Sequence, residues 1–201
     1  MKILDLTQTL TNFPYPGDPE LRINEKEMDG FIVSEIRIGS HLSTHVDYPK
    51  HVGLENKNIL NIFKDGIIKG SCCCISLNNY KENIPKNCDI LLIYTGASKY
   101  WGKEEYFKKI PEIPFLNDII KSNIKCVGID ACTIGGFEEH KKLLSNNILI
   151  IENLNENLKN LVGKKFYFLG LPLKIYDIDA SPIRCVAIFK KKENRNKIRK
   201  Q

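Results

Sequence analysis

Three of the four histidines in this 201-residue chain lie in one short segment, and that segment restricts the backbone more than any other. His41, His45 and His51 fall with Asp47 in the stretch from Ser40 to Val52. All four occupy odd positions, so a β-strand would place their side chains on one face. In a straight strand, however, His41 and His45 would lie about 13 Å apart, too far for two ligands of one metal ion. We therefore expect a strand that runs into a coiled, liganding turn.

The residue types in this segment predict a metal site. Neutral imidazole and carboxylate are the usual ligands of zinc and related divalent transition metals. Water bound to such an ion becomes a nucleophile at neutral pH. Pro49 fixes its own φ and lacks an amide hydrogen, which is typical of a loop and not of a central strand.

A second candidate pair lies in the other half of the chain. His140 falls in a stretch with helical spacing at 137–144, and Glu152 follows an apolar run at 148–151. The carboxyl ends of buried strands are where α/β proteins commonly form sites, so Glu152 is a candidate ligand. Taken alone, the two residues fit a surface histidine and a solvent-facing glutamate better than a site.

The distribution of apolar residues predicts an α/β domain. Strands are expected at 3–6, 31–38, 67–77, 89–94, 124–129, 148–151, 165–173 and 183–189. Helices are expected at 56–64, 117–122, 137–144 and 154–161, with a helical aromatic stretch at 100–107. We predict one domain, residues 1–189, with a single mixed β-sheet and helices packed on it.

The net charge of +6 comes from the C-terminal end of the chain alone. Residues 190–201 hold seven basic residues and one acidic residue, so the rest of the chain is neutral. A terminal run of this kind is usually a frayed, solvated tail, with nucleic-acid or membrane-surface contact as the less common outcome. The composition thus makes a nucleic-acid partner a minor alternative.

The seven cysteines and the apolar runs indicate the cellular compartment of the protein. Cys72, Cys73 and Cys74 are consecutive within an apolar run, and the cysteines show no CxxC spacing. We expect buried, reduced thiols and not a disulfide framework, with a cysteine zinc site or nucleophile as a minor alternative. No apolar run is long enough to span a membrane, and we predict a cytoplasmic protein.

Outside the histidine segments, the proline-rich stretch at 12–19 is a candidate for substrate contact. It is either a plain connector or an aromatic lid in which Phe13 and Tyr15 cover a planar substrate. Trp101 is a third aromatic candidate, and it fits a core-facing position equally well.

The stretch from His41 to His51 resembles a family signature, H-x-G-T-H-x-D-x-P-x-H. This is the signature of the metal-dependent cyclase/hydrolase family, which includes bacterial kynurenine formamidase (arylformamidase) and isatin hydrolase. Further matches are Tyr15-Pro-Gly-Asp-Pro19, Tyr94-Thr-Gly96, Gly128-Ile-Asp130, the spacing from His140 to Glu152 with Glu152-Asn153-Leu154, and Ser181-Pro-Ile-Arg184. The resemblance covers the chain up to the basic tail, and it implies the family's swivelling β/β/α fold.

The resemblance implies two divalent transition-metal ions in each chain. His41, His45 and Asp47 would hold the first ion, and Asp47 would bridge to a second ion held by His140 and Glu152. Zinc is the favoured ion, and manganese is the second candidate. One position departs from the signature, because Ser43 stands where the family has glycine. Glycine often marks a positive φ, so this serine shifts the turn or adds a hydroxyl near the metal.

The same resemblance implies an enzyme of tryptophan catabolism, an arylformamidase that hydrolyses the amide bond of N-formylkynurenine to kynurenine and formate. His51 would be its acid/base, because a histidine pKa near 6.5 allows proton transfer at neutral pH. Two alternatives stay open: a family hydrolase for another cyclic amide or a lactone, such as isatin hydrolase, and a non-catalytic, metal-stabilised binding protein. The resemblance also implies a small-molecule substrate and a homo-oligomer, a homodimer or a tetramer.

Overall fold

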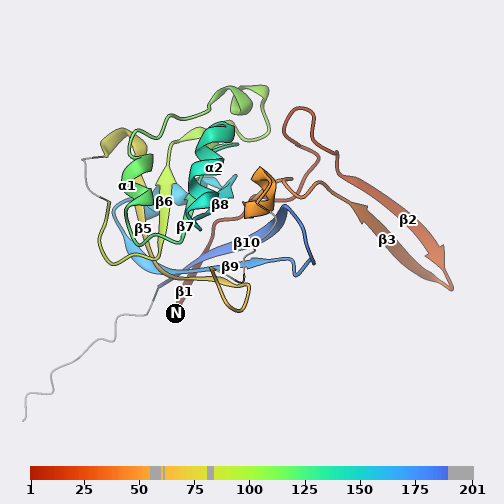
Figure 1. The fold of residues 1–201 in the computed structure, drawn as a ribbon. Helices are drawn as coiled ribbons and strands as arrows, with labels where there is room; N and C mark the ends of the chain where they lie inside the picture. The colour runs from red at the N-terminus through yellow and green to blue at the C-terminus, as the bar shows by residue number, and fades with distance from the viewer. Residues whose placement is uncertain (55–59, 61, 81–83, 190–201) are drawn as a thin grey trace, which may run out of the picture.

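The computed structural model describes residues 1–54, 60, 62–80 and 84–189 (Figure 1). The strands are β1 (Lys2–Asp5), β2 (Arg22–Met28), β3 (Phe31–Arg37), β4 (His45–Asp47), β5 (Ile68–Ser76), β6 (Ile90–Tyr94), β7 (Cys126–Ile129), β8 (Leu149–Glu152), β9 (Lys165–Pro172) and β10 (Ala180–Phe189). The helices are α1 (Leu116–Ile120) and α2 (Phe137–Ser145), with 3-10 helices η1 (Pro49–Val52), η3 (Leu77–Asn79), η4 (Ala97–Tyr100), η5 (Glu104–Lys108) and η6 (Glu156–Leu161). The sequence-based prediction of a mixed α/β fold is confirmed.

The main sheet closes on itself. Its strand order is β1-β10-β4-β8-β7-β6-β5-β9, and β9 pairs back onto β10. The inner run β5, β6, β7 and β8 is parallel, whereas the pairs made by β1, β4, β9 and β10 are antiparallel. The parallel part therefore falls in the middle of the chain, where predicted strands and helices alternate.

Strand alternation divides the buried residues into two cores. In β6, Ile90 and Leu92 belong to one buried cluster, while Leu91 and Ile93 belong to the other. This follows because successive side chains of a strand point to opposite faces. The first cluster draws on every strand of the closed ring and fills its interior. The second lies between the sheet and the helices α1 and α2, which cover its outer face (Figure 1).

The hairpin of β2 and β3 projects away from this body as an arm (Figure 1). All fourteen of its strand residues are exposed. The sequence predicts the second strand of this arm but not the first. The segment from Arg22 to Met28 is mostly polar and charged, and its strand state comes from pairing with β3 and not from burial.

The helical predictions hold in outline, with two changes of type. The aromatic stretch at 100–107 contains the 3-10 helix η5 and not an α-helix, and the expected helix at 154–161 is the 3-10 helix η6. Most of the predicted helix at 56–64, and the tail at 190–201, lie outside the described residues. Within the described ranges, no helix has both the length and the apolar character needed to cross a membrane.

The cysteine prediction is wrong for one pair. Cys73 and Cys88 form a disulfide, whereas the other five cysteines are free and buried. The two residues meet because β5 and β6 run side by side, so that their Cα atoms lie 6.0 Å apart, within bridging distance. The cytoplasmic location stays a prediction.

Candidate metal centre

The histidine segment folds as a turn, a short strand and a 3-10 helix. His41 lies in the turn, His45 and Asp47 lie on β4, and His51 lies in η1. As expected, a strand, β3, leads into the liganding turn, but the short strand β4 that follows the turn was not predicted. The two-residue spacing of His45 and Asp47 keeps both on one face of β4.

Ser43 has the backbone conformation that the family glycine suggests. Its φ is 63°, in the left-handed region that non-glycine residues rarely adopt. The turn is held by neighbours: the Ser43 carbonyl accepts a hydrogen bond from Asn153 Nδ2 at 2.9 Å, and the Thr44 hydroxyl donates to the Asn153 carbonyl at 2.6 Å. The Ser43 hydroxyl donates a hydrogen bond to the Gln8 carbonyl at 3.4 Å. The serine thus points to the backbone of the first segment of the chain.

Strand pairing brings the two predicted halves of the site together. β4 lies between β10 and β8, and the register places His45 directly opposite Glu152. The His45 Nε2 atom lies 3.6 Å from Glu152 Oε2. The predicted meeting of the histidine segment with the end of the strand at 148–151 is therefore present in the structure.

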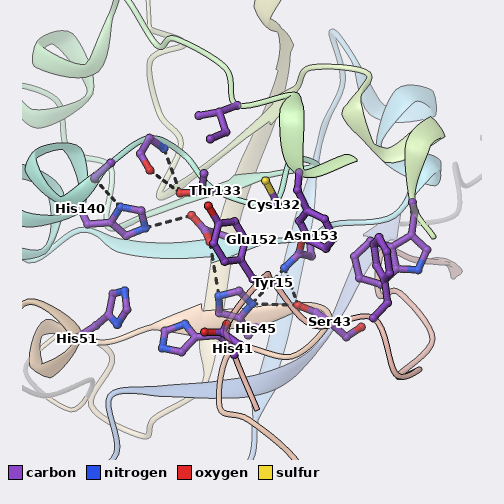
Figure 2. Close-up of a pocket in the computed structure, with 17 residues that line it drawn as sticks. Tyr15, His41, Ser43, His45, His51, Cys132, Thr133, His140, Glu152 and Asn153 are labelled. Carbon is purple, nitrogen blue, oxygen red and sulfur yellow. Dashed lines mark hydrogen bonds and ion pairs between the residues drawn. The ribbon is translucent and has the colours of Figure 1, made fainter. Parts of the chain in front are cut away.

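Helix α2 delivers the fourth histidine. Its start is fixed by Glu139, whose carboxylate accepts a hydrogen bond from the Gly136 N–H at 2.8 Å. Leu143 and Leu144 are buried and hold the inner face against the sheet. The same face carries His140, whose Nε2 lies 3.2 Å from Glu152 Oε1. Figure 2 shows His41, His45, His140 and Glu152 converging from the turn, β4, α2 and β8.

Asp47 lies at the centre of this group. Its side chain is fully buried, and Oδ1 lies 3.0 Å from His41 Nδ1 and 3.3 Å from His45 Nε2. Oδ2 faces the other way, 3.5 Å from His140 Nε2. Each carboxylate oxygen therefore faces a different set of imidazoles.

In His45 and His140, the ring nitrogen that points away from Asp47, here called the outer nitrogen, lies beside a backbone carbonyl. This contact determines which nitrogen faces the centre. Nδ1 of His45 lies 2.9 Å from the Ser43 carbonyl, and Nδ1 of His140 lies 2.9 Å from the Gly136 carbonyl. Because a carbonyl only accepts, Nδ1 carries the hydrogen in both rings, and Nε2 is left to face the carboxylates. Metal-ligating histidines are commonly oriented in this way.

The pKa values reflect the crowded carboxylates. Burial lowers the pKa of His41, but the nearby carboxylates of Asp47 and Asp179 outweigh this effect and raise the pKa to about 9. Burial also opposes protonation of His140, yet Asp47 and Glu152 raise its pKa to about 11. Burial tends to raise the pKa of Asp47, and the surrounding histidines hold it well below its usual range. Without a metal, protons on the histidines compensate the buried carboxylates.

The donor set fits a divalent metal. His41, His45 and Asp47 offer ligand atoms that lie within 4.8 Å of one another, and so do Asp47, His51 and His140. Nε2 of His45 and both oxygens of Asp47 are buried without a hydrogen-bond partner. Buried polar atoms are normally satisfied, so these three atoms fit a cation that lies between them. The two faces of Asp47 agree with the predicted bridging role, which stays a prediction.

His51 lies at the rim of this centre. Its side chain is 35% exposed, and its ring centroid is 4.3 Å from that of His41 and 5.7 Å from that of His140. Burial lowers its pKa, and His41 and His140 lower it further against the opposing effect of Asp47. His51 is thus neutral at pH 7 and able to accept a proton, unlike the two histidines beside it.

An aromatic-walled cavity of about 350 Å³ opens over the centre. The predicted substrate residues all line it, and Phe13 packs edge-on against Trp101 with ring centroids 5.1 Å apart. Phe107 joins them, 4.7 Å from Phe13 and 5.6 Å from Tyr15. The stretch at 12–19 is therefore a wall of the cavity and more than a connector.

A family comparison identifies this chain. The model of the Cyclase family matches residues 4–135. The chain belongs to the cyclase family. It is 81% identical to an uncharacterised protein of Methanocaldococcus jannaschii, over 94% of this chain and the whole of that protein. It is 26% identical to kynurenine formamidase of Bacillus cereus, over 91% and 95% of the two chains.

Solved structures share the cyclase fold. A predicted metal-dependent hydrolase from Bacillus stearothermophilus superposes with a TM-score of 0.74 at 24% identity, covering 92% of this chain and 97% of that one. An isatin hydrolase bound to thioisatinate gives a TM-score of 0.74 at 19% identity, covering 94% and 93%. At these identities the likeness concerns the fold.

Three further residues belong to this cyclase site, although the sequence patterns assigned them no role. Asp179 contacts His41, Asn153 holds the Ser43 turn, and Cys132 lines the cavity. Asn153 belongs to the quoted match Glu152-Asn153-Leu154, and Asp179 lies two positions before the match that begins at Ser181. Burial, with a smaller effect of Glu152, raises the pKa of the Cys132 thiol to about 11, so it stays protonated at neutral pH. This argues against the alternative of a cysteine nucleophile.

Metal binding to the purified, metal-free protein should release protons. Metal ligation requires neutral imidazole, and the raised pKa values of His41 and His140 mean that both rings are protonated at pH 7. Apparent zinc affinity should therefore rise with pH between pH 6 and 9. Calorimetric titration at pH 7 in phosphate and in Tris should give different heats, because the two buffers take up the released protons with different enthalpies. Equal heats in the two buffers would contradict the assignment.

Proposed function

We propose that this chain is a metal-dependent hydrolase that cleaves a carbon–nitrogen amide bond by means of a metal-activated water. The observation that carries the proposal is Asp47, a fully buried carboxylate with three imidazoles around it and no hydrogen-bond partner on either oxygen. A purely structural carboxylate would be expected to accept hydrogen bonds at such a position. A cation site explains the arrangement.

Each ligand has a place in the proposal. His41, His45 and Asp47 would hold one ion, and His140 with Glu152 would hold a second that shares Asp47. When bound, a divalent ion supplies Lewis acidity, which polarises a carbonyl and lowers the pKa of water. Zinc is the favoured ion because imidazole and carboxylate suit it, and manganese is the second candidate.

His51 would move the proton. It faces the cavity at the rim of the centre, and its lowered pKa leaves it neutral at pH 7. A neutral imidazole can accept a proton from the attacking water and then deliver it to the departing nitrogen. This role does not require His51 to be a ligand.

The substrate we propose is N-formylkynurenine, which gives kynurenine and formate. The aromatic walls of the cavity, Phe13, Tyr15 and Trp101, suit an aryl group beside the metal centre. The relatives named kynurenine formamidase match almost the whole chain. Isatin is the second candidate, because it is also a planar aryl amide and an isatin hydrolase shares the fold.

Two substitutions separate chemistry from metal binding. His51→Ala should keep its metal and lose turnover by about 100-fold or more, because it removes the acid/base alone. Asp47→Ala should lose both metal and turnover, since it removes the shared ligand. Elemental analysis of the proteins purified after metal-replete expression, with an assay of each, tests this. Native protein without any transition metal would count decisively against the proposed function.

A substrate panel separates the hydrolase candidates. We expect formate release from N-formylkynurenine to exceed ring opening of isatin, both measured with the zinc- and manganese-loaded protein. Faster opening of isatin would assign the enzyme to cyclic amides instead. If neither reaction occurs, and if deletion of residues 190–201 abolishes nucleic-acid binding that His51→Ala leaves intact, the chain is a metal-stabilised binding protein.

We also propose that the chain assembles as a homodimer or tetramer through the β2–β3 arm. An isolated two-stranded hairpin is marginally stable in water, and both strands of this arm pack mainly on each other. The arm exposes six large apolar side chains: Ile23, Met28, Phe31, Ile32, Val33 and Ile36. A second copy carries the same exposed strands, so symmetric association would cover both arms at once.

Charges on the arm should therefore break the assembly. We expect the double substitution Ile32→Lys and Ile36→Glu to give a monomer by light scattering, because it places charge at two apolar positions 74% and 60% exposed. The control is Leu173→Lys, an exposed apolar residue outside the arm. A native protein that is already monomeric at high concentration would refute the arm's role.

A further inference from the structure

The three histidines around Asp47 differ in what holds their outer ring nitrogen. Backbone carbonyls, those of Ser43 and Gly136, hold two of them, as described above. The outer nitrogen of His41 is Nε2, which lies 2.9 Å from Asp179 Oδ2. Among the described residues, His41 is thus the one of the three whose outer nitrogen meets a carboxylate. A fixed carboxylate there orients the ring and makes the inner nitrogen more basic than a carbonyl does.

Asp179 is itself held in place. Its Oδ1 accepts a hydrogen bond from the Ser40 hydroxyl at 3.0 Å, and its carbonyl accepts one from the Tyr48 N–H at 2.9 Å. Strand pairing explains this position, because the next residue, Ala180, lies opposite Asp47 in the pairing of β10 with β4. The register therefore brings Asp179 alongside the histidine segment, although 138 positions separate it from His41.

The same carboxylate oxygen also faces His51. Asp179 Oδ2 lies 3.8 Å from His51 Nδ1, beyond a direct hydrogen bond but close enough for charge attraction. The rings of His41 and His51 adjoin, with centroids 4.3 Å apart. The Asp179 carboxylate thus lies between Nε2 of His41, a candidate metal ligand, and the ring of His51, the candidate acid/base.

We infer that Asp179 is a positioning residue of the metal centre, which holds the His41 ring toward the metal and orients His51 beside it. The inference rests on the proposed function, because it concerns the ligand role of His41. Asp179 does not reach the Asp47 side of the His41 ring, so it acts through that histidine. Ser40 acts in turn on Asp179, by holding its second oxygen.

The test is zinc affinity, measured by competition with a chromogenic chelator. Asp179→Ala should weaken zinc binding by about 10-fold to 100-fold, the usual effect of removing an outer partner of a metal ligand. Asp179→Asn should weaken it less, because its amide oxygen still accepts from His41 without the charge. Ser40→Ala keeps the carboxylate and removes its anchor, so it should also weaken binding, by less than Asp179→Ala.

The matched control is Asp177→Asn. Asp177 lies two positions away, is 63% exposed, and pairs with Lys50 at 2.9 Å outside the centre. This variant should bind zinc as the native protein does. In the turnover assay, kcat should fall in Asp179→Ala even at saturating zinc, because His51 loses its partner, whereas a purely structural role would leave saturated kcat unchanged.

The outcomes distinguish this inference from the proposed function. Native protein that binds zinc, with Asp179→Ala and Ser40→Ala that bind it equally well, would overturn the role of Asp179 and leave the proposed function standing. Native protein that binds neither zinc nor manganese would overturn both. Should Asp179→Ala fail to fold, Ser40→Ala and Asp179→Asn still decide, since unchanged affinity in both would reject the inference.

Discussion

Burial of the Asp47 carboxylate is the constraint on which the rest of the structure depends. Removing a carboxylate from water costs several kcal/mol unless charge or hydrogen bonds replace its hydration. In this protein, three imidazoles replace the hydration of Asp47. Nitrogens of His41, His45 and His140 lie 3.0 to 3.5 Å from the Asp47 oxygens. A bound cation and imidazole protons are two ways to meet the same electrostatic need. The site is therefore as much a proton-binding centre as a metal-binding one.

The strands of the closed sheet place this carboxylate and its partners on the outer face of β4. β4 is three residues long, and it is stabilised by β10 on one side and β8 on the other. Each neighbour supplies part of the centre, because β8 ends in Glu152 and the residue before β10 is Asp179. The apolar interior of the ring includes Val46, between the two polar residues of β4. One strand thus anchors the core with one face and builds the site with the other.

The β2–β3 arm lies in the chain between two segments that build the site. Residues before the arm, Phe13 and Tyr15, line the cavity, and the residues after it lead into His41. The arm is therefore rooted beside the site.

The sequence by itself predicted the candidate ligands, and it determined the fold class. Clustered histidines, the spacing of Asp47 and the alternation of apolar runs are local patterns. Such patterns are visible in the sequence without knowledge of the fold. It also located Ser43 as the unusual position, which the structure shows at positive φ. The first arm strand was missed because Arg22 to Met28 lacks an apolar pattern, and the Cys73–Cys88 pair because only strand order brings the two together.

Tertiary structure alone decided which distant residues meet. The pairing of β4 with β8 and β10 brought Glu152, Asn153 and Asp179 to the histidines, and no spacing in the chain encodes that register. It also decided the protonation of the imidazoles, since burial and neighbouring carboxylates give His51 a lowered pKa and His140 a raised one. The physical reason is that charge interactions depend on distance in space, which side-chain identity and sequence spacing do not specify.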